Sequence, residues 1–173
     1  ISLSCNILVV AGGCIRFARA GEVPWRKAML LALIAAPLAF LGGLTPIREK
    51  TFLLTLAVSL IFAGIALLLP RAPERDAQPS RLAGWVPLAV APLGYLAGLV
   101  GIGGGIFLAP LLHLTRWDGA RKIAATTSLF ILVNSISGLA GQLLKAGPER
   151  FGEAMVSGVP LLVAVLIGGQ LGS

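Results

Sequence analysis

The chain alternates long apolar blocks with short polar segments. The uncharged stretches cover residues 1–15, 28–47, 51–70, 82–112, 123–144 and 154–173. Four of these blocks contain about 20 residues, the number that an α-helix rising about 1.5 Å per residue needs to cross a hydrocarbon core of about 30 Å. The pattern therefore predicts four membrane-spanning helices, a shorter apolar run at the start, and one longer block at 82–112.

The overall composition supports a membrane protein. Of 173 residues, 57% are hydrophobic and 12% are charged, and the mean hydropathy is +0.93, whereas soluble domains carry about 25% charged residues. A soluble fold would need amphipathic elements to enclose so many apolar helices, and the runs lack the alternation of a transmembrane β-barrel. We predict an all-α, polytopic transmembrane helical bundle.

The formal net charge of +7 comes from basic residues at the ends of the apolar blocks. This distribution is typical of membrane anchors rather than of a nucleic-acid surface, so no nucleic-acid partner is expected. By the positive-inside rule, the basic loop 16–27 is the best candidate for the cytoplasmic side, although the loop 116–122 is basic too. Cys5 and Cys14 are nine residues apart in an apolar run, a spacing that suits neither a metal site nor a disulfide framework.

The sequence also matches itself at an offset of 126 positions, which aligns Ser2-Leu3 with Ser128-Leu129 and Gly42-Gly43 with Gly168-Gly169. We interpret this as an internal duplication. The first unit covers 1–69 and lacks its N-terminal part, 70–84 is an aqueous linker, and the second unit covers 85–173 and lacks its C-terminal part. The expected whole is a transporter of roughly 250 residues.

The block at 82–112 is the candidate for chemistry. As one straight helix it would be about 46 Å long, well beyond the thickness of the bilayer core. It contains Pro110 and the glycines Gly101, Gly103, Gly104 and Gly105, which predict a break. Unwound backbone at membrane depth needs protein or a wet cavity around it, and a glycine turn can offer N–H groups to a small anion. Close helix packing through small residues explains the glycines equally well.

Polar side chains follow in the next apolar block. They are Thr126, Thr127, Ser128, Asn134, Ser135 and Ser137. Asn134 can donate to a bound oxyanion or bond to a neighbouring helix. We select Thr127, Ser128 and Asn134 as candidate ligands, with Ser2 and Asn6 in the first unit, where Asn6 is two residues out of register. No intramembrane base stands beside a nucleophile, so no catalytic, metal or cofactor residues are predicted.

The run Gly94-Tyr-Leu-Ala-Gly98-Leu-Val-Gly101-Ile-Gly-Gly-Gly105, followed by Pro110, Ala125-Thr-Thr-Ser-Leu129 and Asn134, resembles the TauE/SafE sulfite-exporter family, also called the 4-toluene sulfonate uptake permeases. The first unit echoes it with Ser2-Leu3, Asn6 and Ala11-Gly-Gly13, but lacks the glycine motif that the family carries there. The resemblance implies a multi-pass permease of the bacterial inner membrane for sulfite, sulfonates or related organosulfur anions.

The favoured function is therefore a secondary transporter that exposes one site alternately to the two sides. The expected partners are the lipid bilayer and a small anionic substrate, and a homo-oligomer is left open. Two other classes remain at this point: an intramembrane enzyme, and a non-transporting scaffold whose glycines only pack helices.

Overall fold

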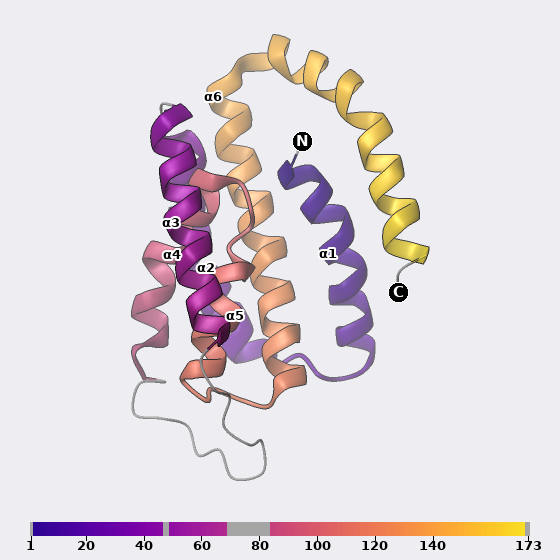
Figure 1. Cartoon of the computed structure of the whole chain (residues 1–173). Coiled ribbons are helices and arrows are strands. Elements are labelled where there is room, and N and C mark those ends of the chain that lie inside the picture. The colour runs from indigo at the N-terminus through magenta and orange to yellow at the C-terminus, as the bar shows by residue number, and fades with distance from the viewer. Residues whose placement is uncertain (1, 47–48, 69–83, 172–173) are drawn as a thin grey trace.

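The computed structural model describes residues 2–46, 49–68 and 84–171, so most of the predicted linker 70–84 lies outside the described residues. Figure 1 shows a bundle of long helices. The helices are α1 (Ser2–Arg19), α2 (Trp25–Leu44), α3 (Glu49–Leu68), α4 (Val86–Val100), α5 (Gly105–Leu114) and α6 (Ala120–Leu171). Every regular element in the described ranges is a helix, which confirms the all-α class.

The break that the sequence predicts in block 82–112 is present. Helix α4 ends at Val100 and α5 begins at Gly105. By contrast, block 123–144 and the described part of block 154–173 belong to one helix, α6, of 52 residues. The polar segment between these blocks contains a proline, which bends a helix more readily than it ends one inside a longer helical sequence. Figure 1 shows this bend, after which α6 runs back beside the bundle.

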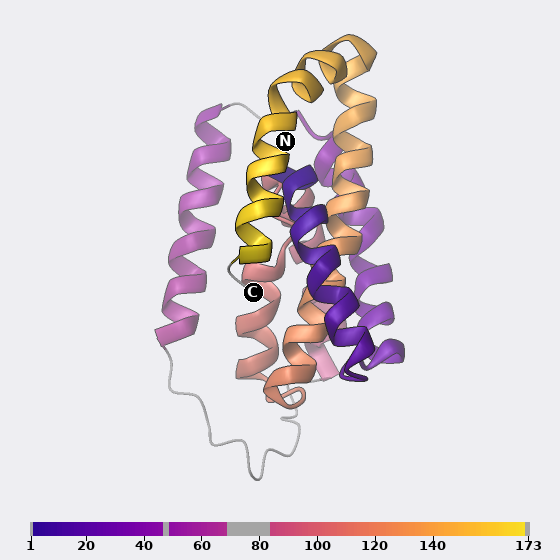
Figure 2. The same cartoon turned by 90° about the vertical axis from the view of Figure 1, so that its right-hand side faces the viewer.

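Helices α4 and α5 form a hairpin that enters and leaves at one end of the bundle (Figures 1 and 2). Gly94 and Gly98 meet Ala35 and Ala39, so α4 runs parallel to α2. Helix α5 begins beside Ile131 of α6, since a methyl group at Gly105 would overlap that side chain. From there α5 runs back toward the end of the bundle where α4 begins (Figure 1). At about 1.5 Å per residue, α4 is about 22 Å long and α5 is about 15 Å long, and each is shorter than a bilayer core of about 30 Å. The pair is therefore re-entrant.

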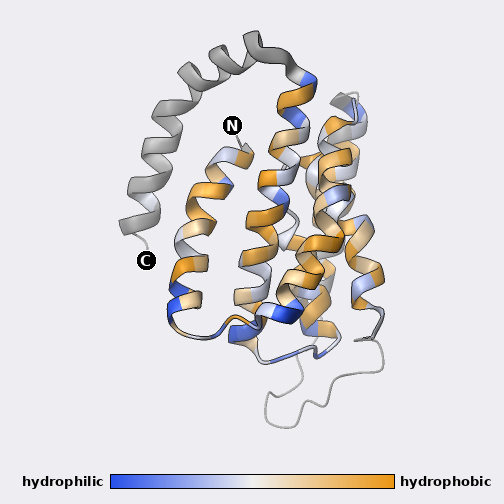
Figure 3. Ribbon diagram, turned by 180° about the vertical axis from the view of Figure 1, so that it is seen from behind, coloured by the Kyte–Doolittle hydropathy of each residue, from blue (hydrophilic) through white to orange (hydrophobic). Residues whose placement is uncertain are grey.

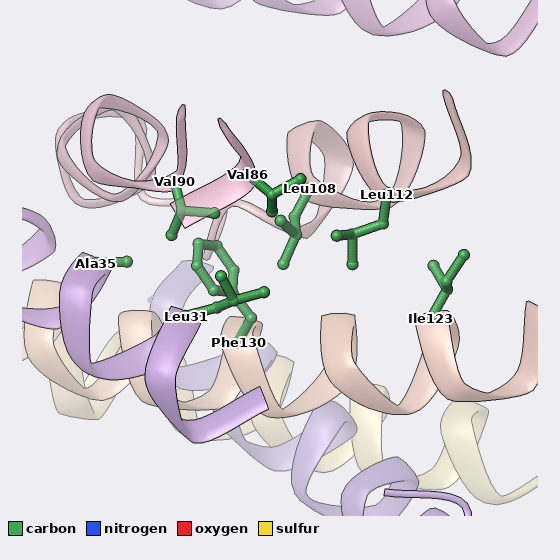
Figure 4. Packing of buried hydrophobic residues seen from close by; sticks show 8 residues of the cluster. All are labelled: Leu31, Ala35, Val86, Val90, Leu108, Leu112, Ile123 and Phe130. Atoms are coloured by element: carbon green, nitrogen blue, oxygen red, sulfur yellow. The ribbon is translucent and has the colours of Figure 1, made fainter. Parts of the chain in front are cut away.

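A cluster of buried apolar side chains joins α2, α4, α5 and α6 in the half of the bundle nearest the ends of this hairpin (Figure 4). Its members are Leu31, Ala35, Val86, Val90, Leu108, Leu112, Ile123 and Phe130. Leu108, Leu112 and Phe130 are fully buried. Since lipid tails are as apolar as these side chains, tight packing rather than water exclusion favours this arrangement.

Glycines bring α2, α4 and α6 together backbone to backbone. A methyl group added at Gly94 would lie 2.6 Å from the carbonyl oxygen of Ala35, and one at Gly98 would overlap the carbonyl oxygen of Ala39. A methyl group at Gly43 would overlap the carbonyl oxygen of Gly138 on α6. Small residues at helix contacts are the common packing device of membrane bundles.

The outer surface of the described helices is apolar. Leu54 on α3 and Leu33 on α2 are 66% and 63% exposed, and Figure 3 shows hydrophilic residues gathered near the helix ends. Among the described residues, two segments are long and apolar enough to cross a membrane, Trp25–Leu44 and Ala120–Lys145. The predicted span 51–70 corresponds to α3, of 20 residues, several of whose side chains are not described.

Candidate substrate site at the broken helix

The turn between α4 and α5 requires glycine. Gly101, Gly103 and Gly104 have φ angles of +73°, +74° and +78°, a region that costs other residues about 1–2 kcal/mol. The carbonyl of Gly104 accepts hydrogen bonds from the N–H groups of Phe107 and Leu108, at 3.1 and 3.2 Å. The N–H groups before Phe107 lie in the first turn of α5, where a helix offers no intrahelical acceptor. The turn thus presents the positive end of α5 to its surroundings.

The contacts of the turn place it midway along a membrane-spanning segment. A methyl group at Gly103 would lie 2.6 Å from Ser135 Oγ, and one at Gly105 would overlap the side chain of Ile131 and lie 3.1 Å from Thr127 Cγ2. These three α6 residues occupy the middle of the apolar segment Ala120–Lys145. The N-terminus of α5 therefore lies near the level of the bilayer centre.

The part of α6 beside the turn carries buried polar groups. Thr126, Asn134 and Ser135 are 0% exposed and Thr127 is 8% exposed. Within the part of the chain that the structure describes, their side-chain oxygens and the Asn134 amide nitrogen have no hydrogen-bond partner. A buried polar group without a partner costs about 1–3 kcal/mol. Four such side chains on three turns of one helix are unusual, because native proteins satisfy most buried polar groups.

Two of these polar side chains, Thr127 and Ser135, face the turn. Thr127, Ile131 and Ser135 follow one another at intervals of four residues and therefore share a face of α6. The glycine contacts identify that face as the one turned to Gly103 and Gly105. Asn134 is the neighbour of Ser135 in sequence and is equally buried. The hydroxyls of Thr127 and Ser135 thus lie on a neutral surface opposite a helix N-terminus, and Asn134 lies about 100° round the helix from Ser135.

The structure brings one pair of residues predicted from sequence into contact, Gly105 and Thr127, and places the other predicted glycines in the same turn. Gly103 and Gly105 meet the α6 face that carries Thr127. A methyl group added at Gly104 would lie 3.1 Å from the ring of Phe130. Gly101 is the αL cap of α4, where an added methyl group would lie 3.6 Å from Gln142 Nε2.

Other predicted residues lie elsewhere or play a local part. Pro110 is buried inside α5, beyond the turn. The Ser128 hydroxyl donates to the Ala124 carbonyl at 2.9 Å, inside its own helix. Asn6 is half-buried on α1, one turn from Leu3, which approaches Gly101. The side chain of Ser2 lies outside the described residues.

One residue on the α6 face that meets the turn was not selected from the sequence, Ser135. Ser135 lies eight residues after Thr127, and this helical spacing was readable in the sequence. The residue chosen instead, Ser128, is rotated away by about 100° from Thr127 on an α-helix. The helical spacing of the polar residues could therefore have identified Ser135 from the sequence.

Both basic loops lie at the same end of the bundle. Asp118 is 3.6 Å from the ammonium groups of Lys27 and Lys122, and Arg121 is 3.6 Å from Glu22. The ammonium of Lys27 also lies 5.1 Å from the centre of the Trp117 ring. Since the two loops meet at one end, the positive-inside rule assigns both of them to the same side of the membrane. Among the described residues no group of three or more His, Cys, Asp or Glu could hold a metal ion.

Long apolar helices, a re-entrant hairpin broken at glycines and basic loops at one end define a helical integral membrane protein. The sequence comparison gives the same class. The model of the sulfite exporter TauE/SafE family matches residues 1–173, and the chain belongs to this family. The family and its named relatives indicate a membrane transporter.

Curated relatives come from bacteria, archaea and plants. A "Probable membrane transporter protein" of Sinorhizobium fredii is 30% identical over 178 residues, covering 99% of this chain and 69% of the relative. One of Methanocaldococcus jannaschii is 22% identical, covering 88% of this chain and 61% of the relative. A "Sulfite exporter TauE/SafE family protein" of Arabidopsis thaliana is 36% identical over 83 residues, covering 48% of this chain and 18% of the relative. No solved structure matches.

Proposed function

We propose that the protein is a secondary transporter of the bacterial inner membrane for small sulfur-containing oxyanions such as sulfite or organosulfonates. The substrate would lie between the N-terminus of α5 and the polar face of α6. Backbone N–H groups at Gly103 to Gly105 and the side chains of Thr127, Asn134 and Ser135 would bind its oxygens. The sequence also predicted Gly101, Pro110, Ser2 and Asn6, which remain predictions, whereas Ser128 bonds to its own helix and is left out of the proposed site.

The observation that carries this proposal is the set of buried polar atoms on α6 that have no hydrogen-bond partner among the described residues. Packing alone gives no reason to place hydroxyls and an amide opposite a helix N-terminus, where each costs about 1–3 kcal/mol when left unsatisfied. An oxyanion would satisfy these donors and would also be favoured by the positive end of the α5 dipole. Because these donors are uncharged, they would bind the anion less strongly than a buried cation, so that it could leave the site again.

The packing on both sides of the site fits alternating exposure. Toward the basic end, the ring of Phe130 and the cluster around Leu108 and Leu112 fill the space between α2, α4, α5 and α6. Toward the other end, Gly43 and Gly138 hold α2 and α6 in backbone contact. The proposed site would then lie between two closed layers, as expected for an occluded state. Transport would need each layer to open in turn.

The directions of the helices indicate how the two proposed units would be oriented relative to each other. At the offset that aligns the two units, α1 corresponds to the first part of α6, and these two segments run in opposite directions in Figure 1. Two units related in this way would have inverted topology, which is common among secondary transporters. Alternating access would then follow from two units exchanging conformations around the central site.

Flux measurements test the proposal. The protein is reconstituted into proteoliposomes, and uptake of labelled sulfite and of a small organosulfonate is measured in the unmodified protein and in Gly103→Leu. We expect transport of at least one of these anions, and its loss in the variant, because the side chain would occupy the space beside Ser135.

A matched control is Gly64→Leu, since a methyl group added at the exposed Gly64 of α3 meets nothing within 4 Å. This variant should keep normal flux. Absence of oxyanion transport by the unmodified protein would contradict the proposed substrate class, and normal flux in Gly103→Leu would contradict the proposed site.

A further inference from the structure

A second polar cluster lies at the end of the bundle opposite the basic loops. The ammonium of Lys145 on α6 donates to the carbonyl oxygen of Thr45, at 3.1 Å. The hydroxyl of Thr45 donates to the carbonyl of Leu41 at 2.8 Å, so in its 3.1 Å contact with Tyr95 it accepts from the tyrosine hydroxyl. These bonds join the C-terminal end of α2 to α4 and α6.

A line of residues connects this cluster to the proposed substrate site. Lys145, Gln142, Gly138 and Ser135 follow one another at intervals of three or four residues, so they lie along one face of α6. At about 1.5 Å per residue, Lys145 lies about 5 Å beyond Gln142 and about 15 Å beyond Ser135 along the helix axis. The Gln142 amide adjoins Gly101, at the start of the broken segment.

We propose that Lys145 is the substrate-receiving cation at the outer mouth of the transport path. The inference rests on the proposed function, and it adds a charged binding residue that lies outside the neutral site at the glycine turn. An arriving oxyanion would replace the Thr45 carbonyl as the acceptor of the Lys145 ammonium. Gln142, one turn deeper, would then offer its amide on the way to Ser135.

The chemistry of the two acceptors favours this exchange. An ammonium forms a stronger hydrogen bond with an anionic oxygen than with a neutral carbonyl. Lys145 is exposed to solvent, and among the described residues its ammonium bonds to a backbone carbonyl, so an anion can displace that partner without leaving a buried charge unpaired. Loss of the bond would also release the C-terminal cap of α2 from α6. Substrate binding and loosening of the outer layer would thus be coupled at one residue.

The test compares Lys145→Gln with Lys50→Gln, which removes an exposed lysine from α3 at the same end of the bundle. Initial rates of sulfite flux are measured in proteoliposomes with substrate supplied from either side. For substrate from the outer side, Lys145→Gln should raise KM up to about fivefold, the effect of one exposed ion pair of about 1 kcal/mol. The rate at saturating substrate, and KM from the inner side, should change little.

Three further results decide the interpretation. Lys145→Arg should restore the outer KM, and the salt dependence of the outer KM should be weaker in Lys145→Gln than in the unmodified protein. Tyr95→Phe breaks the cluster without removing its charge, so it should lower thermal stability without changing KM.

Equal outer KM values in Lys145→Gln and the unmodified protein would overturn the inference and leave the proposed function intact. The same holds for an equal rise in Lys50→Gln, which would indicate a general surface-charge effect. Absence of sulfite or sulfonate transport by the unmodified protein would overturn both proposals.

Discussion

Removing the buried hydroxyls of α6 should stabilise the protein and impair its transport. In Thr127→Val and Ser135→Ala, a polar atom without a described partner is deleted and the side chain does not grow. Each unsatisfied hydroxyl costs about 1–3 kcal/mol when buried in a soluble protein. Buried polar contacts in membrane proteins have averaged about 0.6 kcal/mol, so a gain of about 1 kcal/mol for each variant is a reasonable expectation.

Thr127→Val and Ser135→Ala should bind the substrate more weakly. A hydrogen bond to a charged group contributes about 1.5–3 kcal/mol, which corresponds to roughly 10- to 100-fold weaker binding when it is lost. Thermal unfolding in detergent, with and without sulfite, gives both quantities. The variants should unfold at a higher temperature without the anion and should gain less stabilisation from it.

Ser128→Ala is the matched control on the same helix. Its hydroxyl already bonds to the Ala124 carbonyl, so its removal should change stability by less than about 0.5 kcal/mol and leave flux unchanged. If Thr127→Val and Ser135→Ala instead lowered the unfolding temperature and transported normally, their hydroxyls would be structural. The proposed site would then be refuted.

Three other predictions concern packing, the loops and topology. Gly98→Ala should lower stability by about 1–3 kcal/mol in thermal unfolding, because the new methyl group would overlap a carbonyl of α2, and an unchanged unfolding temperature would contradict the close contact. Asp118→Asn should cost less than about 1 kcal/mol at low salt and less still at about 1 M salt, as expected for ion pairs of a half-buried carboxylate with exposed lysines; a large, salt-independent loss would contradict this. In a variant without the native cysteines, Ala20→Cys and Gly119→Cys should react with an impermeant thiol reagent from the same side, and Lys50→Cys from the other, whereas opposite labelling of the first two would exclude the re-entrant hairpin.

The sequence was sufficient to predict the helical class and the position of the break. Block lengths of about 20 residues reflect bilayer thickness. The dense glycines between Gly101 and Gly105 disfavour a continuous helix whatever surrounds them. The direction of the chain after the break was not predictable, because the apolar block at 82–112 can cross the bilayer once or return. The φ angles at the turn and the contacts of α5 with α6 decide in favour of return.

The choice of ligands on α6 depended on the rotation of that helix. Thr127, Ser128 and Ser135 are equally polar in the sequence, and each could face lipid, a neighbouring helix or a site. Their roles separate only when the α4–α5 hairpin is placed against one side of α6, which buries Thr127 and Ser135 and leaves Ser128 to bond its own backbone. Hydrophobic periodicity is weak in a helix that is apolar on all sides, so it could not supply that rotation.

The glycines of the chain divide between the two interpretations that the sequence left open. Gly94 and Gly98 face carbonyl oxygens of α2, where a side chain would push two helix backbones apart, and these are packing glycines. Gly103 and Gly105 face side chains of α6, and at Gly103 the nearest atom is an unpartnered hydroxyl. A glycine that only packs helices needs no positive φ angle and no polar neighbour without a partner. The turn has both, and it lies between the apolar cluster and the contact of Gly43 with Gly138. Packing thus explains the glycines that hold the bundle closed, whereas those at the turn reverse the chain and belong to the anion site proposed above.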